Sequence, residues 1–308
     1  MTPVSACVVT WNGGERLLRL LASLDGCHEV VVVDNASSDG TADRVAAAHP
    51  GIRLVRNAEN AGYARAMNQA VRAATGDLVL LLNDDVLVPA GALPALVRAL
   101  EAAPGAVAAG PRLVGEDGRE QTSASGVPTL RGLLHRVSLL RWTGAFRAAH
   151  HAWRRPPVAE GPVPALCGAA LLIRREALLR RPLDEGFPFG LEDADLCARL
   201  AADGPLVFAP GVALVHTGGV ATAANLAFAY RGFEVGYARF LRRHQGRGPA
   251  ALYKLLVTLD QPARALGTAL EGLGRLLVGR RDRARESARR LGAILRFMAT
   301  GLPALWWA

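Results

Sequence analysis

Short apolar runs alternate with amphipathic segments of helical period through the first hundred residues. The runs predict buried strands, and the segments between them predict helices. The expected strands are 4–10, 30–33, 52–55 and 77–82, and the expected helices are 15–24, 41–48, 61–74 and 93–102. Strands that alternate with helices in this way form βαβ units around a largely parallel sheet. Such sheets bind their ligands at the carboxyl ends of the strands.

The regular alternation stops near Gly115. Residues 115–162 are rich in Gly, Pro, Arg and His, and we interpret them as a variable excursion that covers or presents a substrate. Order resumes with a strand-like run at 165–173, a short Arg-rich helix, a helix at 194–202, and strands at 206–208 and 212–216. We expect residues 1–220 to form one domain.

The last part of the chain has a helical pattern with three apolar stripes, and we predict a basic amphipathic helical extension over residues 221–308. The stripes are Leu252, Leu255, Leu256 and Leu259; Leu266, Leu270, Leu273 and Leu277; and Leu291, Ile294, Leu295 and Met298. They suit either packing, on the first domain or in a homodimer, or binding to a membrane surface. Both uses together would leave the last stripe, with Trp306 and Trp307, exposed.

The net charge of +9 comes from this extension. Residues 231–308 hold 15 of the 36 basic and 5 of the 27 acidic side chains, a balance of +10 that leaves −1 for the rest. An Arg-rich, amphipathic tail is typical of binding to an anionic leaflet. Nucleic-acid binding is the non-enzyme alternative, but the arginines alternate with leucines and lack interleaved aromatic residues or a known reading motif. We therefore expect no nucleic-acid partner.

Composition excludes several other classes. With 51% hydrophobic and 20% charged residues, the chain is not intrinsically disordered. Its four cysteines lie far apart, which favours reduced thiols in a cytoplasmic protein over a disulfide framework or zinc site. The N-terminus lacks the basic region and cleavage site of a signal peptide. The longest stretch without charge, 204–230, is interrupted by Pro and Gly, so we expect no membrane span.

Candidate chemistry begins with Asp34, at the end of the second strand. A carboxylate there can accept the imide N–H of uracil or thymine. The same residues, with Ser38 and Asp39, also suit a plain strand-to-helix turn with a capping side chain. At the end of the fourth strand stand Asn83, Asp84 and Asp85.

A buried strand that ends in two acids is costly unless a cation meets them. Mg²⁺ or Mn²⁺ bridging a diphosphate would serve, because such ions take one or two carboxylates plus phosphate oxygens. The alternative is a solvated turn in which Asp caps the helix that follows Pro89.

Three acids at a helix start form another candidate. Asp195 fits favourable acid placement in a first helical turn. Glu192 and Asp193 lie beside aromatic residues, where burial raises proton affinity and favours a general base. His216 ends a strand at the same sheet edge and would suit a metal site.

Together these motifs resemble the inverting family 2 glycosyltransferases with the GT-A fold. They are most similar to the bacterial rhamnosyltransferase-like branch, which adds sugars to cell-wall or polysaccharide lipid intermediates. The matching segments, in family order, are 8–13, 31–41, 60–68, 81–85, 168–170, 192–196 and His216. Each segment alone is weak evidence, but the set is specific. The resemblance implies a Rossmann-like, largely parallel mixed sheet with a C-terminal α-helical extension.

The resemblance also implies a role for each matched residue. The base and ribose of a nucleotide-sugar donor would be lined by Thr10, Asn12 and Asp34. The surroundings of its diphosphate and sugar would include Asn60, Gly62, Asn68, Asn83 and Asp84. Asp85 occupies the metal-binding position of the family's D-x-D motif, in which Asn83 replaces the first Asp, and His216 would bind the metal or the diphosphate. Asp193 matches the catalytic base, with Glu192 beside it.

The implied activity is inverting transfer of L-rhamnose from dTDP-rhamnose to a lipid-linked or polysaccharide acceptor in cell-envelope glycan synthesis, assisted by Mg²⁺ or Mn²⁺. A UDP-hexose donor would use the same Asp34 contact and is the alternative. The enzyme would be peripheral on the inner face of the plasma membrane. A sugar nucleotidyltransferase needs a Gly-rich, Arg-containing phosphate loop after the first strand. The corresponding residues here, Thr10–Glu15, contain no Arg, so we discount this class of enzyme. A processive synthase would carry spanning helices and a Q-x-x-R-W motif, which this sequence lacks.

Overall fold

The computed structural model describes residues 2–155, 159–218 and 225–308. They form two compact units. The α/β unit comprises the described residues of 1–127, 154–186 and 192–218, and the helical unit comprises those of 128–153, 187–191 and 219–308. The helical unit therefore takes in two segments from before residue 220 in addition to the C-terminal extension.

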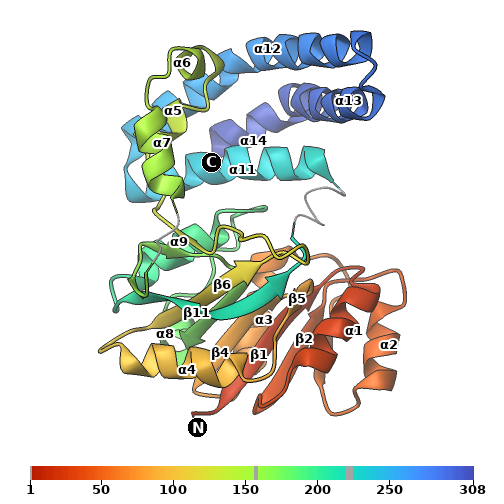
Figure 1. Ribbon diagram of the computed structural model, residues 1–308, viewed down its shortest axis with the longest axis vertical. Coiled ribbons are helices and arrows are strands. Elements are labelled where there is room, and N and C mark those ends of the chain that lie inside the picture. Colours follow the sequence, from red (N-terminus) through yellow and green to blue (C-terminus); the bar gives the residue numbers. More distant parts are fainter. Residues whose placement is uncertain (1, 156–158, 219–224) are drawn as a thin grey trace. The chain divides into compact units, whose positions relative to one another are not determined.

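The α/β unit is built from the elements that the apolar pattern predicts, together with several short additions (Figure 1). Its helices are α1 (Gly14–Ser23), α2 (Thr41–Ala48), α3 (Tyr63–Ala73), α4 (Ala92–Ala102), α8 (Arg175–Arg180) and α9 (Glu192–Leu200). Its strands are β1 (Val4–Thr10), β2 (Glu29–Asp34), β3 (Arg53–Arg56), β4 (Leu78–Asn83), β5 (Val86–Leu87), β6 (Ala108–Val114), β7 (Ala124–Ser125), β8 (Gly161–Pro162), β9 (Ala165–Leu166), β10 (Ala170–Arg174) and β11 (Leu206–His216).

The central sheet is mixed and largely parallel, as expected. Its order in the described residues is β3-β2-β1-β4-β10-β6-β11-β5, with β8 paired to β11. Strands β1 to β4 run parallel, whereas β10 is antiparallel to both β4 and β6. The helices cover both faces, because alternate residues along β1 belong to two different apolar clusters. Leucines of α1 and α4 lie in one cluster, and residues of α3, α8 and α9 lie in the other.

Three details of the sheet differ from the sequence pattern. The run at 165–173 is not one strand, because it is divided into β9 and β10 around Cys167–Ala169. The two strands expected at 206–208 and 212–216 are one strand, β11, with an irregularity between Ala209 and Ala213. Strand β6 was not predicted, since Gly110 and Pro111 in its middle are typical of a loop. It forms nonetheless, between β10 and β11.

The helices of the helical unit come from residues 128–154 and from the C-terminal extension (Figure 1). They are α5 (Leu130–Leu134), α6 (Ser138–Trp142), α7 (Arg147–Arg154, whose last residue falls in the α/β unit), α11 (Leu226–His244), α12 (Arg247–Leu277), α13 (Arg281–Arg296), the π-helix η1 (Phe297–Gly301) and α14 (Leu302–Trp307). In the last of the three apolar stripes, Ile294 is buried, Leu291 and Met298 are half-buried, and Leu295 is 50% exposed. Across the described ranges, no helix has both the length and the apolar character that a membrane span needs.

Candidate active site

The candidate site lies at the carboxyl edge of β1, β2 and β4. Thr10, the last residue of β1, is paired in register with Asp34 of β2, and Val9 is paired with Asn83 of β4. Because these strands run parallel, their carboxyl ends meet at one edge, where α/β sheets bind ligands. The fold thus brings together the strand-end residues that the sequence singled out.

Asp34 is a buried carboxylate with an unused oxygen. The residue is 4% exposed. Its Oδ2 accepts a hydrogen bond from the backbone N–H of Ser37 at 3.1 Å. Its Oδ1 is buried and has no hydrogen-bond partner among the described residues. Leaving a buried acceptor unsatisfied costs about 1–3 kcal/mol, so this atom is suited to a donor group from a ligand.

Asn12 joins the loop after β1 to the loop after β2. Its backbone N–H donates to Ser37 Oγ and its Oδ1 accepts the backbone N–H of Ser38, both at 2.8 Å. Asn12 has a φ of +53°, a conformation that Asn adopts more readily than most residues. The loops beside Asp34 are therefore held together by Asn12.

A network of carboxamides fixes the start of α3. Asn60 Oδ1 accepts from the Gly62 N–H at 3.0 Å and from Asn35 Nδ2 at 2.9 Å. Asn35 is 2% exposed, and its own oxygen accepts from Ala61 N–H and Asn57 Nδ2, each at 3.0 Å. Asn35 was not predicted from the sequence as a site residue. Its place directly after the end of β2 is the signal that identifies it.

Asn68 binds a different segment of the α/β unit. Its Nδ2 donates to Leu183 O at 2.9 Å and to Glu185 Oε1 at 3.1 Å, and its Oδ1 accepts the Leu183 N–H at 3.0 Å. These hydrogen bonds use both the nitrogen and the oxygen of the Asn68 carboxamide. Asn68 therefore holds residues 183–185 against α3, and its contribution to a ligand site would pass through that segment.

Asp84 is tied to the loop after β1. Its Oδ2 accepts from Thr10 Oγ1 at 2.7 Å and lies 3.6 Å from Arg16 Nη2. Burial raises the pKa of Asp84, and these two partners offset that effect only in part. A Cβ at Gly13 would lie 2.1 Å from Thr10 Oγ1 and 2.6 Å from Asp84 Oδ2. Only glycine at position 13 allows this close approach.

His216 ends β11 with its ring directed at Asp85. His216 Nε2 lies 3.3 Å from Asp85 Oδ1. Gln121 Nε2 donates to the backbone oxygen of His216 at 2.7 Å, which places Gln121 Oε1 2.7 Å from His216 Nδ1. Because a carboxamide oxygen can only accept, Nδ1 carries the hydrogen, and a neutral ring presents a lone pair at Nε2. Gln121, which the sequence analysis missed, therefore sets the orientation of this histidine.

The Asp85–His216 pair is a partial cation site. Burial would raise the pKa of Asp85, but when Nε2 of His216 also carries a proton, its hydrogen bond and charge outweigh burial and place the pKa of Asp85 below its ordinary value. Two facing acceptors are stabilised by a proton or a metal ion between them. In the described part of the chain, no cluster of three or more His, Cys, Asp or Glu side chains is arranged to hold a metal. A cation here would take its remaining ligands from a substrate.

Asp193 stands at the first turn of α9, held by backbone groups. The Gly168 N–H donates to its Oδ2 at 3.0 Å and the Ala194 N–H to its Oδ1 at 2.8 Å. A Cβ at position 168 would lie 2.8 Å from the Cβ of Asp193, so glycine allows the contact. Burial raises the pKa of Asp193 in spite of these hydrogen bonds. A fixed carboxylate with raised proton affinity is suited to general-base chemistry.

Glu192 and Tyr63 lie close to this carboxylate. The pKa of Tyr63 is raised well above its ordinary value, first by burial and then by the charges of Glu192 and Asp193. Tyr63, at the start of α3, was not singled out from the sequence. Asp195, by contrast, is fully buried and accepts from Arg199 Nε at 2.8 Å, a structural ion pair within α9.

The family model described as "Glycosyl transferase family 2" matches residues 5–179. The chain belongs to this family. It is therefore a glycosyltransferase. It is 34% identical over 236 residues to the N-acetylglucosaminyl-diphospho-decaprenol L-rhamnosyltransferase of Mycobacterium tuberculosis, covering 70% of this chain and 76% of the relative.

Solved structures share the fold of this family 2 glycosyltransferase. A mannosyltransferase from Pyrobaculum calidifontis, in complex with GDP-Man and Mn²⁺, matches with a TM-score of 0.53 and 22% identity, covering 97% of this chain and 87% of that one. GalNAc-T7, with UDP, GalNAc and Mn²⁺, matches with a TM-score of 0.53 and 17% identity, covering 78% and 50%. The expected GT-A fold and rhamnosyltransferase-like family are thereby confirmed. The residues matched by the family model contain the strand-end acids, whereas Glu192, Asp193 and His216 lie beyond them.

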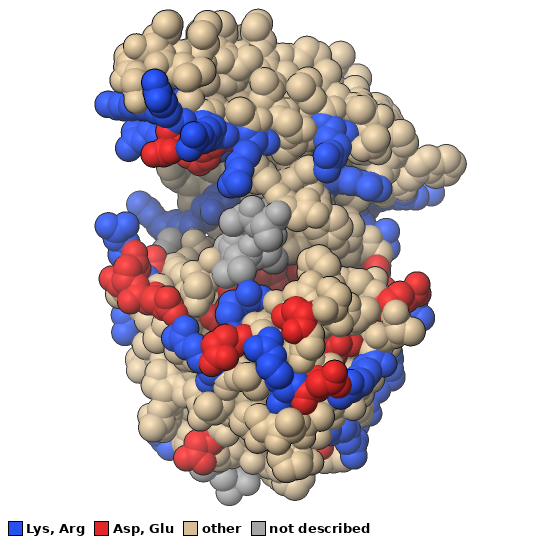
Figure 2. Space-filling model, turned by 90° about the vertical axis from the view of Figure 1, so that its right-hand side faces the viewer, with Lys and Arg blue, Asp and Glu red and all other residues tan. Residues whose placement is uncertain are grey.

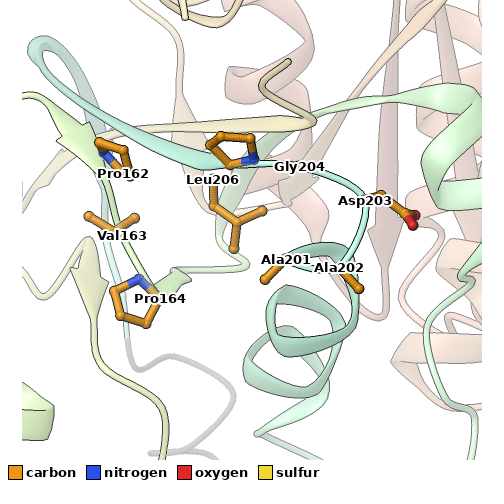
Figure 3. A pocket seen from close by; sticks show the side chains of 9 residues that line it. Pro162, Val163, Pro164, Ala201, Ala202, Asp203, Gly204 and Leu206 are labelled. Carbon is orange, nitrogen blue, oxygen red and sulfur yellow. The ribbon is translucent and has the colours of Figure 1, made fainter. Parts of the chain in front are cut away.

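A shallow pocket of the glycosyltransferase lies away from these residues. It is formed by Pro162–Pro164 and by residues 201–206, which follow α9 (Figure 3). The acids stand at the other end of that nine-residue helix, about 13 Å away. Asp203 at the pocket receives two hydrogen bonds from Arg181, each at 2.8 Å. We therefore assign the pocket no part in the chemistry.

Proposed function

We propose that this glycosyltransferase moves L-rhamnose from dTDP-rhamnose to a lipid-linked acceptor with inversion of the anomeric centre. The observation that carries the donor assignment is the buried, unsatisfied Oδ1 of Asp34. The imide N–H of thymine is a neutral donor that would satisfy it. The similarity to a mycobacterial rhamnosyltransferase supports both the sugar and an acceptor of the diphospho-polyprenol kind.

Asp85 and His216 would bind Mg²⁺ or Mn²⁺ together with the donor diphosphate. The fit rests on the carboxylate oxygen and the ring nitrogen that face each other at 3.3 Å. When bound, such an ion would neutralise charge that develops on the leaving nucleoside diphosphate. Gln121 would keep the hydrogen on Nδ1, so that Nε2 stays available. Thr10 would hold Asp84 beside this position.

Asp193 would act as the general base. It would take the proton from an acceptor hydroxyl while that oxygen attacks the anomeric carbon from the face opposite the diphosphate. The new C–O bond forms as the bond to the diphosphate oxygen breaks, which inverts the centre. Gly168 and Ala194 would fix the carboxylate through their N–H groups, and burial would keep its proton affinity high.

A lipid-linked acceptor places the reaction at a membrane surface, so we propose peripheral binding at the inner face of the plasma membrane. The excess of ten positive charges in residues 231–308 supports attraction to an anionic leaflet. A UDP-hexose donor is the alternative to dTDP-rhamnose, because uracil presents the same imide N–H to Asp34.

A thermal-shift panel with dTDP-rhamnose, UDP-glucose and GDP-mannose, each with Mg²⁺, Mn²⁺ or a chelator, tests the donor and the metal. A ligand that binds the folded state raises its apparent stability. We expect dTDP-rhamnose to stabilise the enzyme most, GDP-mannose to have little effect, and chelation to remove most of the shift. Equal shifts in wild type and in Asp34→Asn would contradict the role of Asp34, and full transfer activity after exhaustive chelation would contradict the role of the metal.

Gln121→Leu sharpens the metal test without touching a proposed ligand. Loss of the partner that orients His216 should weaken Mn²⁺ binding, measured calorimetrically with dTDP present, about 10- to 100-fold. Gln121→Glu, which retains an acceptor for Nδ1, should recover much of this affinity. Unchanged binding in Gln121→Leu would show that His216 needs no such partner.

A further inference from the structure

Helix α12 carries a row of leucines on its exposed side. The leucine row consists of Leu255, Leu259, Leu266, Leu270, Leu273 and Leu277, which are between 46% and 80% exposed. At 100° per residue, these six positions fall within about 60° of the helix circumference. Leucines scattered singly over a surface need no explanation, but a continuous exposed stripe marks an interaction surface.

The charged residues of α12 lie on its other side. Every Lys, Arg, Asp and Glu of the helix is at least about 110° from the centre of the row on a helical projection. Lys254 is buried and donates to the backbone oxygen of Trp306 at 3.1 Å. Asp260 is buried and accepts the Ser138 N–H at 2.9 Å. The outward surface of α12 is therefore apolar well beyond the row itself.

Basic side chains lie on α13, the helix that packs against α12. α13 packs on α12, where Arg275 Nη1 donates to Ser287 Oγ at 2.8 Å. Arginines of α13 such as Arg281, Arg283 and Arg289 are exposed. In Figure 2 the uppermost surface of the helical unit is free of charged side chains, and Lys and Arg gather below it. Packed helix axes are separated by about 8–10 Å, which is close to the depth of about 5–10 Å to which an interfacial helix buries its apolar face.

We propose that the leucine row of α12 docks the enzyme on an anionic lipid bilayer. α12 lies in the plane of the interface with its leucines at the acyl-chain boundary, and the arginines of α13 reach the lipid headgroups. Trp142 of α6, which is 92% exposed beside α12, adds an interfacial anchor. The inference rests on the proposed function for its purpose, since a lipid-linked acceptor lies in such a bilayer.

A second copy of the chain is the other candidate partner, and two observations disfavour it. A leucine seam between two helices is normally flanked by charged residues, whereas Ala, Gly, Pro and Thr flank this one, and Pro262 falls where the seam would continue between Leu259 and Leu266. In addition, residues 231–308 carry an excess of ten positive charges. Two copies would repel each other, whereas an anionic surface is complementary.

The test is vesicle binding by the full chain with the triple variant Leu266→Gln/Leu270→Gln/Leu273→Gln. On phosphatidylcholine vesicles that contain phosphatidylglycerol, we expect wild-type protein to co-sediment and the triple variant to bind about a hundredfold more weakly. The matched control is Leu179→Gln on α8, an exposed leucine outside the row at 42% exposure, which should bind as wild type does. Arg281→Gln/Arg289→Gln should reduce the preference for anionic over neutral vesicles.

Two further readouts separate the possible outcomes. Thermal unfolding of the triple variant should match wild type, because the substituted side chains are exposed. Equal vesicle binding by the triple variant and wild type would overturn the proposal, as would a wild-type dimer in lipid-free buffer that the triple variant dissociates. Binding of dTDP should be unchanged in all these variants. Loss of vesicle binding in the triple variant, with no donor binding in any protein, would sustain the docking surface and remove the proposed function.

Discussion

Glu234 of the helical unit and the candidate-site acids of the α/β unit are buried in opposite ways. In the helical unit, Glu234 is fully buried and accepts from Arg136 Nη2 at 3.1 Å and Arg264 Nη1 at 3.0 Å. Burial alone would raise the pKa of Glu234, but the two guanidinium groups hold it below its ordinary value. Tyr253 donates a further hydrogen bond to the same carboxylate. The helical unit thus supplies both the counter-charges and the hydrogen bonds for the carboxylate of Glu234.

In the α/β unit, Asp195 is likewise paired with Arg199, but the candidate-site acids Asp34 and Asp193 are only partly satisfied by their own chain. Asp193 has backbone N–H donors, and its pKa remains raised by burial. Asp34 has one buried oxygen without a partner in the described structure. We propose that the difference reflects two purposes: a carboxylate that stabilises the fold is neutralised by its own chain, whereas one that acts on a substrate is left for that substrate to complete. Four experiments test this distinction.

The largest effect is expected from Asp193→Asn. The amide keeps the shape of the side chain but cannot take a proton, so kcat should fall about 10²- to 10⁴-fold. Donor affinity, measured calorimetrically with dTDP, should stay within about twofold, because dTDP does not rely on the base. Near-normal turnover would show that Asp193 is not the base. Asp195→Asn is the matched control in the same helical turn, and there the loss should appear in stability.

Glu234→Gln should destabilise the helical unit by about 3–5 kcal/mol, because it removes the buried charge that pairs with the partly buried Arg136 and Arg264 and leaves Arg264 with Asp260 alone. Urea denaturation followed by far-UV circular dichroism measures this. The control is Glu286→Gln, which removes a half-exposed partner of Arg290 and should change stability by less than about 1 kcal/mol. A cost for Glu234→Gln as small as that of the control would mean that the network does not hold the unit together.

Asp34→Asn should weaken nucleotide binding and leave stability nearly unchanged, the reverse of what is expected for Glu234→Gln. The free protein should lose little or no stability, since a buried and incompletely satisfied charge is removed. Affinity for dTDP should fall about 10- to 100-fold, the value of a hydrogen bond to a charged acceptor. Calorimetric titration and urea denaturation of the same sample give both quantities. A large loss of stability with unchanged nucleotide affinity would place Asp34 with the structural acids.

The smallest effect concerns pH. Because burial raises the pKa of Asp193 above the ordinary aspartate value of 3.8, its basic form is lost at a higher pH than usual. Activity should therefore decline on the acid side of neutrality, at a pH above 3.8. Because the folded state raises the pKa of Asp193, this carboxyl group destabilises the folded protein at pH values above its pKa in the unfolded state. A profile of kcat/KM against pH measures the acid limb. Glu192→Gln should keep an acid limb, because the base itself is still present, and disappearance of the limb in that variant would assign the base to Glu192.

Much of the α/β fold could be predicted because its signals are local. An apolar run followed by Asp34 or by Asn83–Asp85 identifies both a strand and its carboxyl end, and parallel pairing then brings those ends together. Partners contributed across long sequence separations were not predictable in this way. Gln121 meets His216 only because β6 and β11 are neighbours, and Tyr63 meets Asp193 only because α3 and α9 cover the same sheet face.

The helical extension shows the same limit. Its three apolar stripes are evident in the sequence, but the sequence left open whether they pack or stay exposed. The structure packs Ile294 into the unit and leaves Leu295, Trp307 and the leucine row of α12 exposed. An amphipathic pattern shows that a helix has an apolar side, but it does not show which helices find a partner for that side.

The sequence by itself determined the family, the parallel βαβ core, the acids at the strand ends and the concentration of positive charge in the C-terminal quarter. Each of these depends on residues that are adjacent in the chain or on regular periodicity. Only the tertiary structure decided which carboxylates are neutralised, which histidine tautomer faces Asp85, and which leucines remain exposed. Those properties depend on contacts between distant segments, because burial and pairing are set by the whole fold.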